Sequence, residues 1–275
     1  MSKNKFSIYN KNVIVTGASG GLGKEIVKQL ITKYQCRVIG VGRNEIKMKA
    51  LCSELGDLSD KFSYRLFDVS DSGKWCEFAE DTVDDGFNAD IIINNAGVLP
   101  QFTRFGKYSD DEVQSGFNTN LKSVINSTQA FLPLLERKEG TAIINISSSD
   151  ALCPLAGTSV YSAGKAAVKA LSECMREEYR GKIYIPTVCP GFIRTDIMKN
   201  QAHNNNSIID TVSMPASKAA KKILKKANYR RSRIVIGADA HFMSLAYRLV
   251  PVASQRFMNF IFRISKLDLF SEIYK

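Results

Sequence analysis

The chain has 275 residues, of which 44% are hydrophobic and 24% are charged. These proportions are typical of a globular protein with a full core, and they exclude an intrinsically disordered chain. With only His203 and His241, a histidine-rich metal site or a Ser-His-Asp triad has too few residues, so we predict no metal. No apolar run reaches the roughly 18–20 residues that cross a bilayer, and the N-terminus lacks the apolar stretch of a secretion signal.

The six cysteines are scattered without a CxxC pair. This pattern favours free thiols in a reducing compartment over a disulfide framework, and we expect a cytoplasmic protein. The net charge of +11 is concentrated near the C-terminus. Residues 197–267 contain 13 lysines and arginines against two aspartates, so the rest of the chain is balanced.

Short β-branched runs alternate with helix-length stretches over most of the chain. The runs that predict buried strands are residues 12–16, 36–41, 62–67, 90–93, 141–146, 183–188 and 233–236. The clearest predicted helices are residues 22–34, 110–136 and 160–179. This alternation predicts βαβ units with right-handed crossovers. We therefore predict an α/β fold, a doubly wound parallel sheet of about seven strands (a Rossmann fold), with a C-terminal helical extension. Residues 1–239 would form the domain built on this sheet, and residues 240–275 the amphipathic extension.

The first predicted strand runs directly into a glycine-rich turn and then into a helix. Glycines let the backbone approach a pyrophosphate, and the N-terminus of the helix supplies N–H donors and partial positive charge. A structural turn alone could explain the glycines, but strand, turn and helix in this order favour a dinucleotide. The predicted contacts here are Gly17, Ser19, Gly21, Leu22 and Gly23.

The end of the second predicted strand distinguishes the two nicotinamide cofactors. An NAD site has an acidic residue about here for the ribose 2′-hydroxyl. This chain has Gly42 at that position and Arg43 beside it. A guanidinium pairs with a phosphate, so the pattern favours NADP(H), although a solvated surface arginine would look the same.

Tyr161 and Lys165 lie four residues apart on a predicted helix, which places both side chains on one face. A phenol has an ordinary pKa near 10 and is a poor acid–base catalyst at neutral pH. A nearby cation lowers that pKa towards the working range. By itself the pair is weak evidence, because tyrosine and lysine meet by chance on many helices.

Over residues 10–237 the sequence resembles the classical short-chain dehydrogenase/reductase family. The resemblance rests on separate motifs in the family's order: TGASGGLG at 16–23, Asp68-Val69, NNAG at 94–97, Asn120, Ser147-Ser148, YSAGK at 161–165, and Pro190-Gly191 with Thr195. It implies an oxidoreductase that interconverts a ketone and a secondary alcohol. The Tyr-to-Lys spacing and the glycine loop differ from those of the family's enoyl reductases and epimerase-like members.

The resemblance also implies roles for individual residues. Tyr161 would protonate the substrate oxygen, and Lys165 would bind the nicotinamide ribose and lower the pKa of Tyr161. Ser148, rather than its neighbour Ser147, would hydrogen-bond the substrate oxygen, and Asn120 would hold a water that links Lys165 to solvent. Further implied cofactor contacts are Asp68, Val69, Asn95, Ala96, Gly97, Pro190, Gly191, Ile193 and Thr195.

The chain departs from many relatives after residue 237. It lacks their Val-Asp-Gly-Gly-like ending and continues for more than 30 residues, which counts against fatty-acid synthesis. The ending is more similar to members that act on hydrophobic ketones, such as steroids or retinoids. A 3-oxoacyl reductase and a membrane-associated NADP(H)-binding protein with weak or no catalysis remain alternatives. We expect the substrate pocket to be framed by residues 99–105, 150–157 and the stretch after Gly191, including a lid at 193–212.

Apolar and basic residues are interleaved in the C-terminal extension, and Pro251 divides it. Such helices could cover the substrate cleft or form a dimer contact, and we expect a homo-oligomer. They could also lie on a membrane surface, with the lysine- and arginine-rich stretch at 218–233 attracting anionic lipid. Nucleic acid is not expected, because no binding motif accompanies the charge.

Overall fold

The computed structural model describes residues 6–195, 213–264 and 273. Its centre is a parallel sheet whose main path runs in the order β10-β7-β5-β4-β1-β2-β3, with β6 pairing only with β5. This is the predicted doubly wound arrangement, and the fold class is confirmed. The strands are β1 (Asn12–Thr16), β2 (Arg37–Gly42), β3 (Phe62–Leu66), β4 (Ile91–Asn94), β5 (Thr141–Ile146), β6 (Ile183–Tyr184), β7 (Thr187–Pro190) and β10 (Arg233–Ile236).

One predicted strand, residues 183–188, is divided in two. Ile183 and Tyr184 pair with the start of β5, while Thr187 and Val188 pair with its end. Pro186 lies between them and has no N–H to donate to the ladder. Its carbonyl still accepts a 3.2 Å hydrogen bond from the N–H of Asn145, so the two short strands continue along one neighbour.

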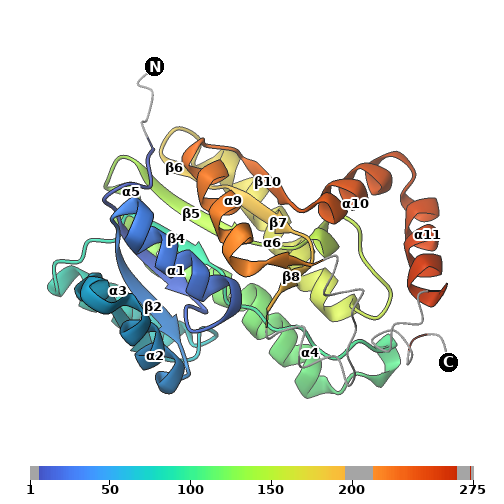
Figure 1. Ribbon diagram of the computed structural model, residues 1–275, viewed down its shortest axis with the longest axis horizontal. Helices are drawn as coiled ribbons and strands as arrows, with labels where there is room; N and C mark the ends of the chain where they lie inside the picture. The colour runs from blue at the N-terminus through green and yellow to red at the C-terminus, as the bar shows by residue number, and fades with distance from the viewer. Residues whose placement is uncertain (1–5, 196–212, 265–272, 274–275) are drawn as a thin grey trace.

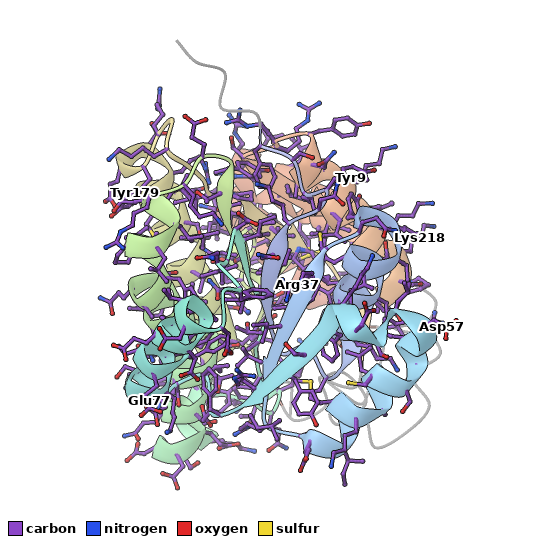
Figure 2. The ribbon with its side chains drawn as sticks, turned by 90° about the vertical axis from the view of Figure 1, so that its left-hand side faces the viewer. Tyr9, Arg37, Asp57, Glu77, Tyr179 and Lys218 are labelled. Atoms are coloured by element: carbon purple, nitrogen blue, oxygen red, sulfur yellow. The ribbon has the colours of Figure 1, made fainter. Side chains whose placement is uncertain are left out.

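Helices cover both faces of the sheet (Figure 1). In the turned view, Glu77 and Tyr179 lie on one side of it, and Asp57 and Lys218 on the other (Figure 2). One layer contains α1 (Gly21–Tyr34), α2 (Glu45–Leu55) and α9 (Ala216–Asn228), and the other α3 (Ser72–Asp84), α5 (Ser123–Glu136) and α6 (Ser159–Glu178). Two apolar clusters fill the spaces between the layers, one with Ile26, Leu30 and Ile223, the other with Trp75 and Phe131. Burial of such side chains stabilises the fold by about 1.5–3 kcal/mol each.

The predicted helix at 110–136 is not uniformly α-helical. It consists of α4 (Asp110–Phe117), a π-helical turn η3 (Asn118–Lys122) and α5. Ser109 and Glu112 form a capping box at its start, which explains why it begins there. The π-turn contains Asn120 and therefore changes the direction of the side chain that the sequence analysis placed in the active site.

The C-terminal region forms two helices, α10 (Ala238–Leu249) and α11 (Pro251–Ile264), divided at Pro251 as predicted. Because α10 begins at Ala238, it crosses the domain boundary that we expected after residue 239. Met243, Tyr247 and Met258 of these helices pack against Cys153, Leu155 and Phe192 of the central domain. Within the described part of the chain, no helix is both long enough and apolar enough to cross a membrane.

Short strands and helical turns complete the structure. Of the lid expected at 193–212, residues 196–212 lie outside the described part of the chain. Its first two residues, Ile193 and Arg194, pair in parallel with Met214 and Pro215, which follow the expected lid. These strands are β8 (Ile193–Arg194) and β9 (Met214–Pro215), and the short helical turns are η1 (Gly56–Lys61), η2 (Phe105–Lys107) and η4 (Ser149–Ala151).

Candidate active site

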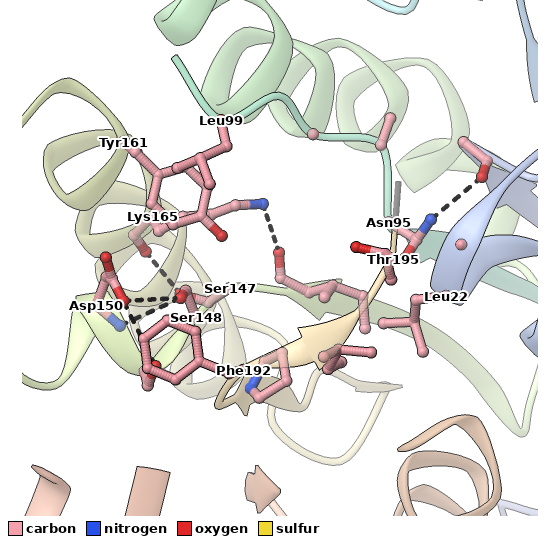
Figure 3. A pocket seen from close by; sticks show the side chains of 18 of the residues that line it. Leu22, Asn95, Leu99, Ser147, Ser148, Asp150, Tyr161, Lys165, Phe192 and Thr195 are labelled. Carbon is pink, nitrogen blue, oxygen red and sulfur yellow. Dashed lines mark hydrogen bonds between the residues drawn. The ribbon is translucent and has the colours of Figure 1, made fainter. Parts of the chain in front are cut away.

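A cavity of about 360 Å³ lies at the carboxyl edge of the sheet (Figure 3). Its walls begin where β1, β4, β5 and β7 end. From β1 the chain adds β2 and β3 on one side, and then returns to add β4, β5 and β7 on the other, so the switch point lies between β1 and β4. Ligands of open α/β sheets bind at such switch points. The predicted residues that line this cavity are Gly17, Ser19, Gly21, Leu22, Asn95, Ala96, Gly97, Ser148, Tyr161, Lys165, Pro190, Gly191, Ile193 and Thr195.

The glycine turn has the shape that a pyrophosphate needs. Gly17 has φ +64°, and a methyl group there would lie 3.0 Å from the backbone of Ala96. Gly23 does not line the cavity; a side chain there would collide with the carbonyl of Gly17, so its role is close packing of α1 on β1. Gly20 caps α1 without a side-chain hydrogen bond, and the first turn of α1 has no acidic residue. The backbone N–H groups at this end of α1 therefore face the cavity wall without a side-chain cap, which fits an anionic dinucleotide.

Arg43, Asp68 and Val69 lie outside the cavity wall. Arg43 and Asp68 form an exposed ion pair of 3.1 Å, so the two predicted contacts bind each other. Hydrogen bonds from Ser70, and then the charge of Arg43, hold the pKa of Asp68 below its ordinary value. An exposed pair of this kind is worth at most about 1 kcal/mol, so a phosphate can compete for the guanidinium at little cost. The side chain of Val69 packs in the core, and a contact with adenine would have to use its backbone.

Ser147 and Ser148 follow β5 and point in different directions. Ser147 also lines the cavity, but its hydroxyl donates a 2.7 Å hydrogen bond to the carbonyl of Lys165. Ser148 caps η4, and its hydroxyl lowers the pKa of Tyr161. The geometry thus favours Ser148 as the serine that faces Tyr161, as the resemblance implied.

Lys165 is buried one turn after Tyr161, and its Nζ lies 5.8 Å from the centre of the tyrosine ring. The ammonium donates a 3.0 Å hydrogen bond to the carbonyl of Ile146. Burial lowers the pKa of Lys165 to about 8.

We expected Lys165 to lower the pKa of Tyr161, but in the structure this pKa is raised. Burial raises the pKa of this phenol well above its ordinary value, the charge of Asp150 raises it further, and the hydrogen bond with Ser148 lowers it. In this geometry the phenol is held protonated, which suits a proton donor to a carbonyl oxygen.

Asn120 does not line the cavity. Its side chain is fully buried, donates a 2.8 Å hydrogen bond to the carbonyl of Val98 and accepts one of 3.0 Å from the N–H of Val98. The side-chain amide is thus used to hold the loop after β4. Gly97 lies close to both this amide and the ammonium of Lys165. A methyl group on Gly97 would lie 3.0 Å from Asn120 Oδ1 and 3.2 Å from Lys165 Nζ.

The turn after β7 is held from the C-terminal region. Asp239, in the first turn of α10, accepts a 2.7 Å hydrogen bond from the N–H of Phe192. The same carboxylate fills the space where Gly191 would carry a side chain. Thr195 closes over the glycine turn, since a methyl group on Gly21 would lie 3.1 Å from its side chain. The C-terminal region therefore shapes the wall that the sequence analysis assigned to the nicotinamide.

Sequence analysis missed several residues of the cavity wall. Lys47, in the first turn of α2, lines the cavity on the side of Ser19, and nothing in the sequence distinguished it from other lysines. Asp150 and Leu155 fall in a segment that was expected to frame the pocket, without being singled out. Leu99, Phe102 and Phe192 likewise fall in segments that were expected to frame the pocket. The remaining wall residues not predicted as contacts are Gly20, Ile146, Ser147 and Ser149.

Comparison with known proteins decides the family. Residues 11–206, more than half of the chain, match the family described as short chain dehydrogenase. The chain belongs to this family. A ketoacyl reductase, HetN of Nostoc sp., is 30% identical to this short-chain dehydrogenase over 247 residues, 90% of this chain and 85% of that protein. An NADPH-dependent pterin aldehyde reductase of Arabidopsis thaliana is 32% identical over 215 residues, 78% and 88% of the two chains.

A solved structure of a serine dehydrogenase in its closed form with NADP⁺ superposes with a TM-score of 0.73 at 25% identity. The match covers 82% of this chain and 93% of that one. The comparisons confirm the predicted class of this short-chain dehydrogenase, an NADP(H)-dependent oxidoreductase that acts on the CH–OH/C=O couple.

Proposed function

We propose that this short-chain dehydrogenase interconverts a ketone and a secondary alcohol on an apolar substrate of steroid- or retinoid-like character, with Tyr161 as the proton donor. The observation that carries the proposal is the meeting of Ser148, Tyr161 and Lys165 at one wall of the cavity. When bound, the nicotinamide of NADP(H) supplies the hydride, while the protein aligns the reacting groups.

Each side chain has a role that fits its contacts. The hydroxyl of Tyr161, held protonated by burial, donates its proton to the carbonyl oxygen of the substrate. Ser148 donates a hydrogen bond to the same oxygen and so stabilises the charge that develops there. Lys165 binds the ribose hydroxyls and restores the proton of Tyr161. Asn120 positions Val98 and Gly97 beside Lys165, and the water that the resemblance assigns to Asn120 stays a prediction.

The wall beyond the catalytic group supports an apolar substrate. Leu99, Phe102, Leu155 and Phe192 line this part of the cavity, and the last two pack against α10 and α11. Each buried apolar group of a ligand gains about 25 cal/mol per Å² that leaves water, which favours a substrate with a large hydrocarbon body. We propose that residues 240–275 are an extension whose first function is to complete this wall.

A second candidate is a 3-oxoacyl thioester, because the relative HetN is named a ketoacyl reductase. The missing Val-Asp-Gly-Gly-like ending weakens this candidate. Both candidates use the same catalytic group, so only the substrate distinguishes them.

The test is NADPH oxidation across steroid, retinoid, 3-oxoacyl and small ketones, with wild type and Tyr161→Phe. Loss of a general acid costs about 10²–10⁴ in rate, so turnover of the best substrate falls by that factor while NADPH binding, followed by fluorescence, remains. Tyr179→Phe, at the other end of α6, is the matched control and keeps its activity. Near-wild-type turnover by Tyr161→Phe would refute the mechanism, and a preference for 3-oxoacyl thioesters would refute the substrate class.

For the partner of the C-terminal helices, we propose an anionic membrane surface. Large apolar side chains are exposed along α10 and α11, and no acidic residue lies between Ala240 and Ile264. In a homodimer through the same face, Arg248, Arg256 and Arg263 of the two copies would face each other without an acidic partner from these helices. The exposed apolar residues are Phe242, Leu245, Leu249, Val250, Val252, Phe257, Phe260 and Ile261.

Co-sedimentation with vesicles containing phosphatidylserine tests this partner. Leu249→Glu with Phe260→Glu lowers the bound fraction, because two charges enter an apolar contact. Ile46→Glu, on α2 and 82% exposed in the wild type, is the matched control and leaves binding unchanged. Equal sedimentation of all variants, or loss of a dimer instead, would refute the membrane proposal.

A further inference from the structure

A buried carboxylate, Asp150, lies beside the catalytic serine and was not assigned a role by the mechanism above. It lines the cavity and is 7% exposed. Its Oδ2 accepts a 3.0 Å hydrogen bond from Thr158, and its Oδ1 lies 3.5 Å from the hydroxyls of both Ser148 and Ser149. Its own N–H donates a 3.2 Å hydrogen bond to Ser148 Oγ. Figure 3 shows this cluster next to the ring of Tyr161.

Hydroxyl groups surround the carboxylate of Asp150. Within the described residues, no salt bridge involves Asp150, and only hydrogen bonds lower its pKa. The elements that pack against η4 are α6, β7 and α10. Their titratable groups include Tyr161 and Lys165 of α6, Cys189 of β7, and Asp239 and His241 of α10, and Cys153 lies just after η4. Of these, Tyr161 and Cys153 have pKa values raised first by burial and then by the charge of Asp150.

The hydroxyl of Ser148 has a single hydrogen and two acceptors within reach. One is Oδ1 of Asp150, and the other is the oxygen that the substrate or Tyr161 presents. A carboxylate forms charge-assisted hydrogen bonds about twice as strong as neutral ones, so an ionised Asp150 holds this hydrogen. A neutral carboxyl group can donate a hydrogen bond itself, which leaves the hydrogen of Ser148 for the substrate.

We propose that Asp150 is a positioning residue whose protonation sets the direction of the Ser148 hydroxyl, so that ketone reduction is favoured when Asp150 is neutral. The inference rests on the proposed function, because it assigns Ser148 as a donor to the substrate oxygen. Asp150 exchanges one proton with solvent and no atom with the substrate. When Asp150 is neutral, the hydroxyl of Ser148 donates its hydrogen to the carbonyl oxygen of the substrate instead of to Asp150.

The pH range follows from the burial of Asp150. Burial raises the pKa of this carboxyl group to about 6, so it changes charge between roughly pH 5 and 7. A single ionisation at this pKa lowers the neutral fraction about tenfold between pH 5 and 7. The turnover number for reduction therefore falls about tenfold over this range, before Lys165 loses its charge near pH 8.

The test compares pH profiles of kcat on the best ketone of the panel. Asp150→Asn keeps an acceptor for Thr158 and a donor for Ser148, so the step near pH 6 disappears while the step near pH 8 remains. Thr158→Val removes a hydrogen bond that favours the charged carboxylate and moves the step to higher pH. Thr158→Ser keeps that hydroxyl and is the matched control, with the step unmoved.

A second measurement does not depend on turnover. An infrared titration of the wild-type protein shows the band of a protonated carboxyl group lost near pH 6, and Asp150→Asn lacks that change. An unchanged step near pH 6 in Asp150→Asn, or a loss of rate at every pH without a change of profile, overturns the proposal. In either case Tyr161→Phe still tests the proposed function, so the two failures are distinguishable.

Discussion

Substituting alanine for Gly97 tests the geometry around Lys165. The added methyl group would lie 3.0 Å from Asn120 Oδ1 and 3.2 Å from Lys165 Nζ, closer than carbon normally approaches either atom. Asn120 is fully buried and clamped to Val98 by two hydrogen bonds, so it cannot move. The end of the Lys165 side chain must therefore shift by a few tenths of an ångström. This shift disturbs the 3.0 Å hydrogen bond that its Nζ donates to the carbonyl of Ile146.

The expected effect on catalysis exceeds the effect on folding. Displacing a catalytic group by about 1 Å can cost about 10²-fold in rate, so we expect kcat of Gly97→Ala to fall on the order of 10- to 100-fold. Overpacking costs about 1–3 kcal/mol, which leaves the protein folded but with a lower Tm. Steady-state kinetics with NADPH and a differential scanning calorimetry trace measure the two quantities on the same preparation.

Gly106→Ala is the matched control, because a methyl group on that exposed glycine would meet nothing within 4 Å. Its kcat and Tm stay at wild-type values. If Gly97→Ala lost stability yet kept kcat within about twofold of wild type, the position of Lys165 would not limit the reaction and the reasoning would be wrong.

Three further predictions follow from single contacts. Asp239→Ala leaves the N–H of Phe192 without its charged acceptor and lowers the unfolding free energy by about 1.5–3 kcal/mol in denaturant titration, whereas Asp239→Asn loses less; equal stability would contradict this role. Since burial holds the pKa of Lys165 at about 8, its ammonium is lost as pH rises through that value, and kcat for reduction falls above pH 8; a flat profile would exclude a charged lysine from the mechanism. Arg43→Ala weakens binding of NADPH but not NADH in fluorescence titrations and barely changes stability, because its ion pair is exposed; equal loss for both cofactors would refute the phosphate contact.

The strand pattern predicted the fold well, because parallel strands are buried on both faces and appear as continuous apolar runs. The errors lie where backbone hydrogen bonding, which periodicity does not report, decides the structure. Pro186 divides a mostly apolar run, and the π-turn at Asn120 lies within a stretch whose pattern is helical.

The candidate site was predictable to the extent that its residues are close in sequence or belong to family motifs. The pair Tyr161 and Lys165 needs only one helical turn, and the sequence was sufficient for it. The sequence could not show that Asp150 is buried and held by hydroxyl groups, because its environment comes from η4, α6 and α10 together. The ion pair of Arg43 with Asp68 likewise joins residues 25 positions apart.

By itself, the sequence of this short-chain dehydrogenase determined the type of fold, the order of its strands along the chain and the placement of Tyr161 and Lys165 on one helical turn, because these depend on local periodicity and short spacings. Only the tertiary structure decided which way each group points: Ser147 towards Lys165, Asn120 towards Val98, and Asp239 towards Phe192. It also decided that the C-terminal helices pack against Leu155 and Phe192, two residues of the cavity wall. Packing brings together side chains from distant segments, and no spacing along the chain records those contacts.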